Sequence, residues 1–394
     1  MRILFLSFYF EPDLCAGSFR NTSLVEALQA SLPRGSEIDV LTTLPNRYSE
    51  FSVDAMEIEI RGIVSIKRVD LPSHKSGMLD QSKAFYIYAN AVRKHVQGKN
   101  YDVVYASSSR MMTAFLGAVI ARKIKAPLYL DIRDIFVDTI KDVLSKKVVF
   151  IMKPIFAAVE SFTIKSASHL NVVSEGFVDY FNSRYSNLST SIFTNGIDSE
   201  FVKNLPELEE PSSKQNGLIR ILYAGNIGKG QGLHLIVPML AAELAGRATI
   251  RLIGAGGQLG KLKSALNDAN IKNVELLPPI CRQQLIGEYQ AADVLFLHLN
   301  DYDAFKKVLP SKIFEYGAIG KPILAGVAGY AAQFIELNIE NSAIFPPCSV
   351  EDGVVAFNSL NLVTKPRLDF IDKYGRKRIM RKMATDVCRV GQRG

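Results

Sequence analysis

The chain has 394 residues, 48% of them hydrophobic and 22% charged, and its net charge of +8 comes almost entirely from the C-terminal segment Lys373–Gly394. This length allows two domains with cores of their own, and the composition excludes a wholly disordered chain. The four cysteines lie far apart without a CxxC pair or a Cys/His cluster. We therefore expect neither a disulfide framework nor a zinc site, and a reducing compartment.

The first half of the chain alternates apolar strands with helical patterns. Strands are predicted at Arg2–Phe8, Glu37–Thr42, Ile63–Val69, Tyr101–Ala106, Leu128–Asp131, His169–Val173 and Ser191–Thr194. Helices are predicted at Arg20–Ala30, Gln81–Gln97, Met111–Lys125 and Val148–Ser166. This alternation predicts a mostly parallel sheet covered on both faces, in an N-terminal Rossmann-like domain over residues 1–199.

Two apolar stretches of this half need separate interpretation. The opening run MRILFLSFYFEP resembles a signal-peptide core, but it stops at Glu11-Pro12 without a cleavage pattern, so we interpret it as the first strand. The segment KKVVFIMKPIF at Lys146–Phe156 is basic and apolar. Burial in the core is its usual explanation, and a surface that approaches anionic lipid is the alternative. No segment reaches the roughly 18 uninterrupted apolar residues that a membrane span needs.

A polar, acidic segment rich in Pro, Ser and Gly separates the halves, and we interpret residues 200–217 as an exposed linker. Strands are then predicted at Ile219–Tyr223, Thr249–Ile253, Val274–Leu277, Val294–His298, Pro322–Ala325 and Ala343–Phe345. Helices alternate with them at Leu233–Leu244, Gln258–Asn270, Gln283–Ala291 and Pro310–Ile319. A second Rossmann-like domain is expected over residues 218–365. Two such domains would place a ligand cleft between the carboxyl ends of their strands.

Glycine-rich loops follow three of the predicted strands. In the second domain, AGNIGKGQG places Gly225 and Gly228 between a strand and a helix, with Lys229 as a possible counter-charge for phosphate. The loop at Gly254 follows the next strand, and Gly17 follows the first strand of the chain. Each loop could bring backbone N–H groups close to a phosphate, and an ordinary tight turn is the alternative for each.

The segment LPSKIFEYGAIGKPILAG at Leu309–Gly326 is the most informative of the chain. Pro310 suits the first helical position, so a helix is expected to begin there. Its free backbone N–H groups, together with Lys312, form a candidate phosphate site. Glu315 follows on the same face and can accept two hydrogen bonds from a ribose diol. The alternative is a capped surface helix with a weak exposed ion pair.

The C-terminal segment, residues 366–394, is predicted to contain a basic amphipathic helix, because Ile379, Met383, Val387 and Val390 fall near helical spacing. We expect this helix to cross back and dock on the N-terminal domain, with its basic outer face available to anionic lipid. A nucleic-acid partner is not expected, because interleaved aromatic residues and a recognition motif are missing.

Together these segments resemble glycosyltransferases of the GT-B fold, and among them the large retaining family 4. The resemblance spans most of the chain and rests on EPDLCAGSFR, on Asn195–Asp198 with Phe201, on the glycine loop at Gly225 and on PSKIFEYGAIGKP. More narrowly, DIRDIF, GNIGKGQGL and KKVLPSKIFEYGAIGKPILAGVAGY look like bacterial O-antigen N-acetyl-L-fucosaminyltransferases of the WbuB type. The resemblance implies an α/β fold of two Rossmann-like domains whose parallel sheets face a central cleft.

The resemblance also implies roles at a UDP-sugar donor site. Glu315 would hold the ribose hydroxyls, and Lys312 with its helix N-terminus would hold the diphosphate. The first glutamate of the family's paired motif is replaced by Lys307, and Asn226 and Gln231 stand where the family often has Arg and Lys. The residues expected at the donor site are Gly17, Gly225, Asn226, Gly228, Lys229, Gly254, Arg282, Ser311, Lys312, Ile313 and Glu315.

Catalysis would consist of stabilising the departing UDP by helix dipoles, backbone N–H groups and lysines, without a metal or another cofactor. Asp301-Tyr302-Asp303 spells a DxD pattern, but metal binding is not expected there. Retention of configuration is implied by the resemblance. The expected catalytic residues are Asp131, Arg133 and Asp134 on the acceptor side, and Lys307. An Arg133 ion pair that merely fixes its loop is an equal alternative.

The expected function is transfer of a sugar, N-acetyl-L-fucosamine or a related N-acetylated deoxysugar, from a UDP-sugar to an undecaprenyl-pyrophosphate-linked saccharide. Such a reaction belongs to O-antigen or other surface polysaccharide and lipopolysaccharide synthesis. It would place a cytoplasmic enzyme peripherally on the inner face of the cell membrane, at an anionic surface. A UDP-sugar epimerase on the same scaffold and a degenerate nucleotide-sugar-binding protein are the alternatives. A dehydrogenase and a P-loop enzyme are not expected, because the sequence lacks the glycine motifs of both classes.

Overall fold

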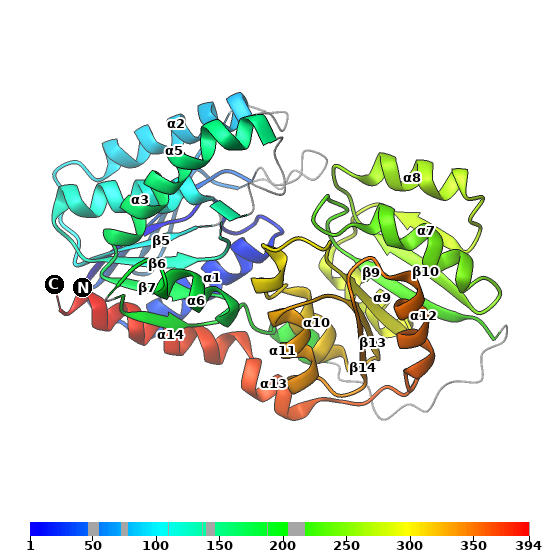
Figure 1. Ribbon diagram of the computed structural model, residues 1–394. Coiled ribbons are helices and arrows are strands. Elements are labelled where there is room, and N and C mark those ends of the chain that lie inside the picture. The colour runs from blue at the N-terminus through cyan, green and yellow to red at the C-terminus, as the bar shows by residue number, and fades with distance from the viewer. Residues whose placement is uncertain are drawn as a thin grey trace. The chain divides into compact units, whose positions relative to one another are not determined.

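The computed structural model of the chain describes residues 1–45, 55–71, 78–108, 110–135, 137–138, 146–186, 188–203 and 217–393. The chain forms two compact units, the first made of Met1–Asn195 with Arg376–Gly394 and the second of Gly196–Gly375. Each unit has one sheet covered by helices (Figure 1). The predicted α/β class with two Rossmann-like units is confirmed.

The first unit contains an eight-stranded sheet in the order β3-β4-β2-β1-β5-β6-β7-β8. Every neighbouring pair is parallel except β3 with β4, which is antiparallel. The strands are β1 (Arg2–Leu6), β2 (Glu37–Thr43), β3 (Ile58–Arg61), β4 (Val64–Val69), β5 (Val103–Ser107), β6 (Leu128–Ile132), β7 (His169–Val172) and β8 (Thr190–Ile192). The sequence pattern predicts all of these except β3, whose short sequence IEIR lies at the sheet edge and buries no side chain fully.

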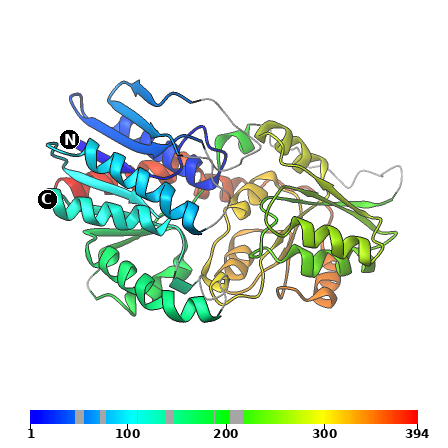
Figure 2. The same ribbon diagram turned by 90° about the horizontal axis from the view of Figure 1, so that it is seen from above.

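Helices cover both faces of this sheet. One layer consists of α2 (Met78–His95), α3 (Met111–Ile124) and α5 (Lys146–Lys165), toward which Figure 2 looks, and the opposite layer contains α1 (Ala16–Ser31) and α14 (Arg376–Gly391). Successive side chains of β5 point to opposite faces of the sheet, so neighbouring residues pack against different helical layers. Tyr105 packs in one cluster with Met380 of α14, whereas the next residue, Ala106, meets Gly117 of α3. The short helices η1 (Glu175–Phe177) and α6 (Val178–Asn182) follow β7.

Helix α14 brings the end of the chain back into the first unit. Ile379, Met383 and Val387 are buried in a cluster that includes Leu24 and Leu28 of α1. Its outward face is basic, with exposed side chains at Lys377, Arg378, Arg381, Lys382 and Arg389, and the exposed Arg393 follows just after the helix. The apolar face of this amphipathic helix is therefore buried by packing within the unit.

The second unit contains a six-stranded parallel sheet in the order β11-β10-β9-β12-β13-β14. Its strands are β9 (Ile219–Ala224), β10 (Ala248–Ile253), β11 (Val274–Leu277), β12 (Val294–His298), β13 (Ile323–Gly326) and β14 (Ser342–Phe345). One hydrophobic cluster lies under α7 (Leu233–Glu243), α8 (Leu259–Asp268) and α12 (Val350–Ser359). The other lies under α9 (Arg282–Ala291), α10 (Lys312–Ile319), α11 (Tyr330–Asn338) and α13 (Leu368–Tyr374).

The limits of the second unit differ from the domain limits that the sequence suggests. Helix η2 (Ser199–Val202) and α13 belong to this unit, because Phe201 and Phe370 are buried in the same cluster as Phe314 of α10. The N–H of Ile197 donates to the carbonyl of Tyr374 at 2.8 Å, which joins the two ends of the unit. Most of the expected linker, residues 204–216, lies outside the described residues.

Candidate donor and acceptor sites

Two glycine loops lie against each other at the carboxyl edge of the second sheet, after the neighbouring strands β9 and β10. The N–H of Gly225 donates to Ile253 at 2.9 Å, and the N–H of Ile227 donates to Ala255 at 2.8 Å. A Cβ atom on Gly254 would lie 1.8 Å from the carbonyl oxygen of Gly225. Only glycine permits this close approach, which keeps a patch of bare backbone at the strand ends.

Hydrogen bonds between residues of the first glycine loop, which follows β9, hold that loop together. Asn226 donates to the Gln231 side chain at 2.9 Å, and the same Gln231 oxygen accepts the N–H of Gly228 at 3.2 Å. The Tyr223 hydroxyl donates to the Asn226 carbonyl at 2.6 Å. Asn226 and Gln231 therefore hold the shape of the loop, and the carbonyl of Lys229 is tied to Asn300 at 3.2 Å.

Lys312, Glu315 and Tyr289 form a hydrogen-bonded triangle beside these loops. Lys312 Nζ lies 2.7 Å from Glu315 Oε2 and 2.8 Å from the Tyr289 hydroxyl, which in turn donates to Glu315 Oε2 at 3.0 Å. Lys312 Cε lies 3.7 Å from the position of a Cβ on Gly225. The structure thus brings the lysine and glutamate of α10 to the glycine loop. Tyr289, from α9, is fully buried and fixes both charged groups in place.

Helix α10 begins at Lys312, two residues after the predicted start at Pro310, because the first turn is a tighter one. The N–H of Ile313 donates to Pro310 at 3.2 Å and that of Phe314 donates to Ser311 at 3.2 Å. Ser311 makes no side-chain cap. Ile313 is buried in the core, so only its backbone is available to a ligand.

Arg282 is a predicted donor-site residue, and Lys307 is a predicted catalytic residue. Arg282, at the start of α9, pairs with Asp198 and with Glu200 at 2.6 Å, and its guanidinium lies 4.9 Å from the ring centre of Phe201. It anchors η2 to α9. Lys307 ends the short helix η3 (Phe305–Lys307) and is half-buried.

The DxD pattern lies in the loop just before η3. Lys306 pairs with Asp303 at 2.8 Å and lies 3.8 Å from Asp301. Across the described ranges, no three His, Cys, Asp or Glu side chains gather closely enough to hold a metal ion.

His298 and Asn300, at the end of β12, join the loops together and are missing from the sequence-based site. Nδ1 of His298 donates to the Gln231 carbonyl at 2.6 Å, and its Nε2 accepts the N–H of Cys348 at 3.0 Å. Asn300 accepts the N–H of Asp301 at 3.0 Å through its side chain. Two polar residues at the end of the apolar run VLFLHLN were the available signal.

Acidification is expected to destabilise the second unit through His298. Burial lowers the pKa of this imidazole from 6.5 to about 4. Between these two pKa values, His298 is protonated in the unfolded chain but neutral in the folded chain. Its contribution to the free energy of unfolding is therefore fully present above pH 6.5 and is lost as the pH falls toward 4. The expected loss is about 3 kcal/mol, measured by urea unfolding across this range.

The matched control is His298→Gln, which cannot titrate. Subtracting its profile from that of the wild type cancels the other groups, including His169 and His234, whose pKa values are also lowered by burial. Parallel profiles for the two proteins between pH 4 and 6.5 would contradict the role of His298.

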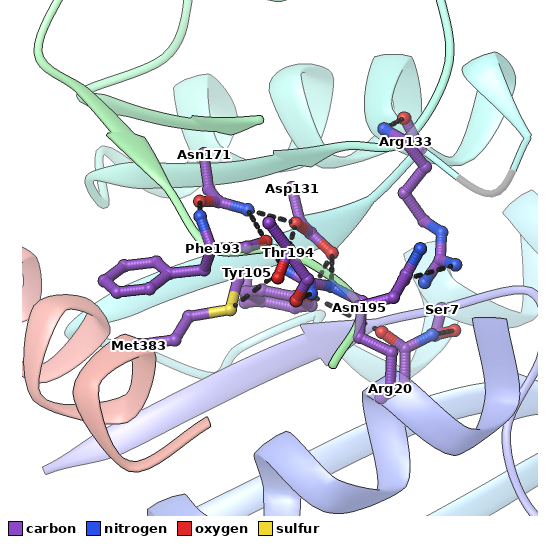
Figure 3. Close-up of polar contacts among 12 residues, drawn as sticks. Ser7, Arg20, Tyr105, Asp131, Arg133, Asn171, Phe193, Thr194, Asn195 and Met383 are labelled. Carbon is purple, nitrogen blue, oxygen red and sulfur yellow. Dashed lines mark hydrogen bonds and ion pairs between the residues drawn. The ribbon is translucent and has the colours of Figure 1, made fainter. Parts of the chain in front are cut away.

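In the first unit, Asp131 is the centre of a fully buried network (Figure 3). Its carboxylate accepts two hydrogen bonds from Arg20, at 2.8 and 2.9 Å, one from Tyr105 at 3.0 Å and one from Asn171 at 2.7 Å. Burial by itself would raise the pKa of Asp131, but the Arg20 guanidinium lowers it below its ordinary value. The carboxylate is therefore held ionised and out of contact with solvent.

Arg20 extends the network to the end of the first unit and to α14. It donates to the carbonyl of Thr194 at 2.6 Å and to that of Phe193 at 2.9 Å, and it contacts the sulfur of Met383 at 3.3 Å. Arg20 lies in the first half of α1, and its side chain is fully buried.

Arg133, Asp134 and Gly17 lie at the carboxyl edge of the same sheet. The N–H of Arg133 donates to Ser108 at 2.8 Å, and its guanidinium donates to Asn195 at 3.3 Å. Asp134 exposes its side chain, whereas Gly17 is buried in the first turn of α1. Of the predicted acceptor-side residues, Asp134 is exposed and Arg133 is half-buried, whereas Asp131 is fully buried.

Two Rossmann-like units with parallel sheets are the architecture of the GT-B fold, and comparison with known families agrees with this fold. Residues 19–187 match the family described as "Glycosyl transferase 4-like domain", and residues 206–378 match "Glycosyl transferases group 1". The chain belongs to the GT-B glycosyltransferases that carry these two domains in this order. No curated protein sequence matches it.

Solved structures share this fold at low sequence identity. HepE from Anabaena, solved in complex with UDP and glucose, is 16% identical with a TM-score of 0.61 over 100% of this chain and 98% of that one. WaaG, a glycosyltransferase involved in lipopolysaccharide biosynthesis, is 16% identical with a TM-score of 0.63 over 99% and 98%. Sucrose-phosphate synthase from Thermosynechococcus elongatus is 13% identical with a TM-score of 0.68 over 100% and 97%. Among the residues described, no helix is both long and apolar enough to span a membrane.

Proposed function

We propose that the protein transfers a sugar from a UDP-sugar to a lipid-linked saccharide. The observation that carries this proposal is the Lys312–Glu315–Tyr289 triangle beside the paired glycine loops. A carboxylate that accepts hydrogen bonds suits a ribose diol, and a lysine at a helix N-terminus suits a diphosphate. The UDP bound by HepE in its crystal structure supports the choice of nucleotide.

Donor binding would rearrange the triangle. In the free protein Lys312 is paired with Glu315, and a diphosphate would draw the ammonium toward the glycine loop while the ribose takes its place on the carboxylate. The N–H groups of the loops and α10, with Lys312 and Lys307, would stabilise the negative charge that develops on departing UDP. Neither step requires a metal. We propose that transfer retains the configuration of the sugar, as the resemblance to family 4 suggests.

On the acceptor side, we propose that Arg133 and Asp134 contact the incoming saccharide and that Asp131 acts as a positioning residue through Arg20. The narrower proposal is a donor carrying N-acetyl-L-fucosamine or a related N-acetylated deoxysugar, and an undecaprenyl-pyrophosphate-linked acceptor in O-antigen synthesis. It rests on DIRDIF and on the run from Lys306 to Tyr330. The enzyme would then work in the cytoplasm at the inner face of the membrane.

A thermal-shift comparison tests the donor. UDP is expected to raise the unfolding temperature, and UDP-N-acetyl-L-fucosamine to raise it further than UDP or UDP-glucose. Lys307→Ala should reduce both the shift from UDP and the additional shift from the sugar, because it removes one of the positive charges proposed to face the diphosphate. No shift with any UDP compound would contradict a UDP site, and equal shifts with all sugars would contradict the narrow donor assignment.

Lys307, in place of a carboxylate, also supports a second candidate, a protein that binds a nucleotide sugar without turning it over. Release of UDP only when a lipid-linked saccharide is present would identify a transferase. Isomerisation of the sugar without an acceptor would identify an epimerase. Tight UDP binding without turnover over a panel of donors and acceptors would favour the binding protein.

A further inference from the structure

Exposed apolar side chains of the first unit gather on one of its two helical layers. Phe150 of α5 is 83% exposed and Ile155 is 52% exposed, and Tyr86 of α2 is also exposed. Helix α3 packs against both α2 and α5, so the three helices form one continuous layer. The adjoining edge strand β3 adds exposed Ile58 and Ile60. Such a collection on one face marks an interaction surface.

Helix α5 has the pattern of a helix that lies in a membrane interface. Phe150, Lys153, Pro154 and Ile155 are exposed together, and we name these four residues the α5 wedge. The only acidic residue of the helix, Glu160, is buried and accepts a hydrogen bond from the Tyr180 hydroxyl at 2.8 Å. The outer face of α5 therefore combines apolar groups with positive charge and carries no negative charge, as an anionic bilayer surface requires.

Basic side chains lie on the same layer as the wedge. Lys83 of α2 is exposed, and so are Arg122 and Lys123 at the end of α3, where the Arg122 guanidinium lies 4.5 Å from the ring centre of Phe162 of α5. Long basic side chains can reach lipid phosphates while apolar neighbours enter the acyl boundary. The charge of this layer thus complements an anionic headgroup surface, whereas a protein partner would need no such excess of one sign.

The basic face of α14 is a different kind of surface. Its exposed residues are charged or polar, and its apolar residues, including Ile379 and Met383, are buried within the unit. That face can attract anionic lipid at a distance, but it has nothing to insert. The exposed aromatic and aliphatic groups belong to the opposite layer.

The position of α5 connects this surface to the acceptor site. The chain leaves β6 at the carboxyl edge, passes Arg133 and Asp134, and enters α5 at its N-terminal half, where the wedge lies. A lipid anchored beside Phe150 would keep its attached saccharide close to this edge of the sheet.

We infer that the α5 wedge inserts into the headgroup and acyl boundary of an anionic bilayer, with the layer of α2, α3 and α5 facing the membrane. The purpose of this insertion rests on the proposed lipid-linked acceptor. The insertion itself can be measured without the reaction, because it needs neither donor nor acceptor.

The absence of tryptophan from the sequence provides a direct test. Phe150→Trp introduces a single indole, and its emission is expected to shift to the blue on addition of phosphatidylethanolamine–phosphatidylglycerol vesicles and to be quenched by brominated acyl chains. Met239→Trp, at an exposed site on α7 of the second unit, is the matched control and should show neither change. An indole at position 150 that stays in a water-like environment while the protein binds the vesicles would overturn the inference.

A second set of variants separates insertion from charge attraction. Phe150→Ser with Ile155→Ser is expected to weaken vesicle binding by about tenfold or more, because both side chains lose their apolar contact with lipid. Replacement of Lys377, Arg378, Arg381 and Lys382 by glutamine should leave the indole shift at position 150 intact. Unchanged binding of the double serine variant, or loss of the shift in the glutamine variant, would place the membrane contact on α14 instead.

The UDP-induced thermal shift should be the same in all these variants. If insertion fails while UDP still stabilises the protein, only the wedge is wrong. If insertion succeeds without any UDP effect, the donor proposal fails and the membrane surface stands.

Discussion

Replacing Asp131 by asparagine is expected to lower the free energy of unfolding by about 3–5 kcal/mol, because the variant leaves the Arg20 guanidinium buried without its counter-charge. Both side chains are fully buried and joined by two hydrogen bonds. Urea unfolding followed by circular dichroism measures the change. The expected primary defect is therefore in stability, and any effect on acceptor turnover follows from the displaced Arg133 loop.

Two further variants control for the position and the charge. Asp134→Asn alters the exposed carboxylate of the same loop and should change stability by no more than about 0.5 kcal/mol. The double variant Arg20→Met with Asp131→Leu removes both charges and should be more stable than Asp131→Asn. Wild-type stability combined with lost acceptor turnover in Asp131→Asn would instead make Asp131 a residue that contacts the acceptor.

Glu315→Gln is expected to reduce affinity for UDP by about 100-fold, since each charge-assisted hydrogen bond to the ribose is worth roughly 1.5–3 kcal/mol and the amide replaces it with a weaker one. Calorimetric titration with UDP measures this loss. The variant also leaves Lys312 without its anionic partner in the free protein. That change alone would favour phosphate binding, so a net loss of affinity reports specifically on the ribose contact.

Glu340→Gln is the matched control in the same unit. Glu340 also forms a lysine ion pair, with Lys365, but both side chains are largely exposed and lie in the segment between α11 and β14 and in the segment after α12, rather than at the glycine loops. Its UDP affinity should equal that of the wild type. Equal affinities for the Glu315 and Glu340 variants would show that the α10 carboxylate does not hold the nucleotide.

The alternation of strands and helices could be predicted because buried parallel strands leave long apolar runs. Strand β3 was not predicted, because an edge strand with exposed isoleucines lacks the buried apolar face that marks a strand in the sequence. Helices α11 and α12 were not predicted for a related reason. Their apolar residues, such as Phe334 and Phe357, pack against neighbours distant in sequence.

Part of the site was also predictable, since Lys312 and Glu315 lie on one helical face and α10 leads into the buried strand β13. The supporting groups were not, because their roles depend on long-range contacts. Tyr289 reaches the triangle from another helix, and His298 links two loops far apart in the chain. The pairing of Asp131 with Arg20 likewise spans more than a hundred residues, so a charged residue at a strand end looked like a ligand contact.

The return of α14 to the first unit has a consequence for how the protein is made. The second unit is an insertion in the sequence of the first, whose core includes Met380 and Val387 packed with Ile3 and Val103. On the ribosome, the second unit can close as soon as residue 375 has emerged, whereas the first must wait for α14 with an apolar surface still uncovered. The N-terminal half of the chain should therefore be the later to resist proteolysis during synthesis.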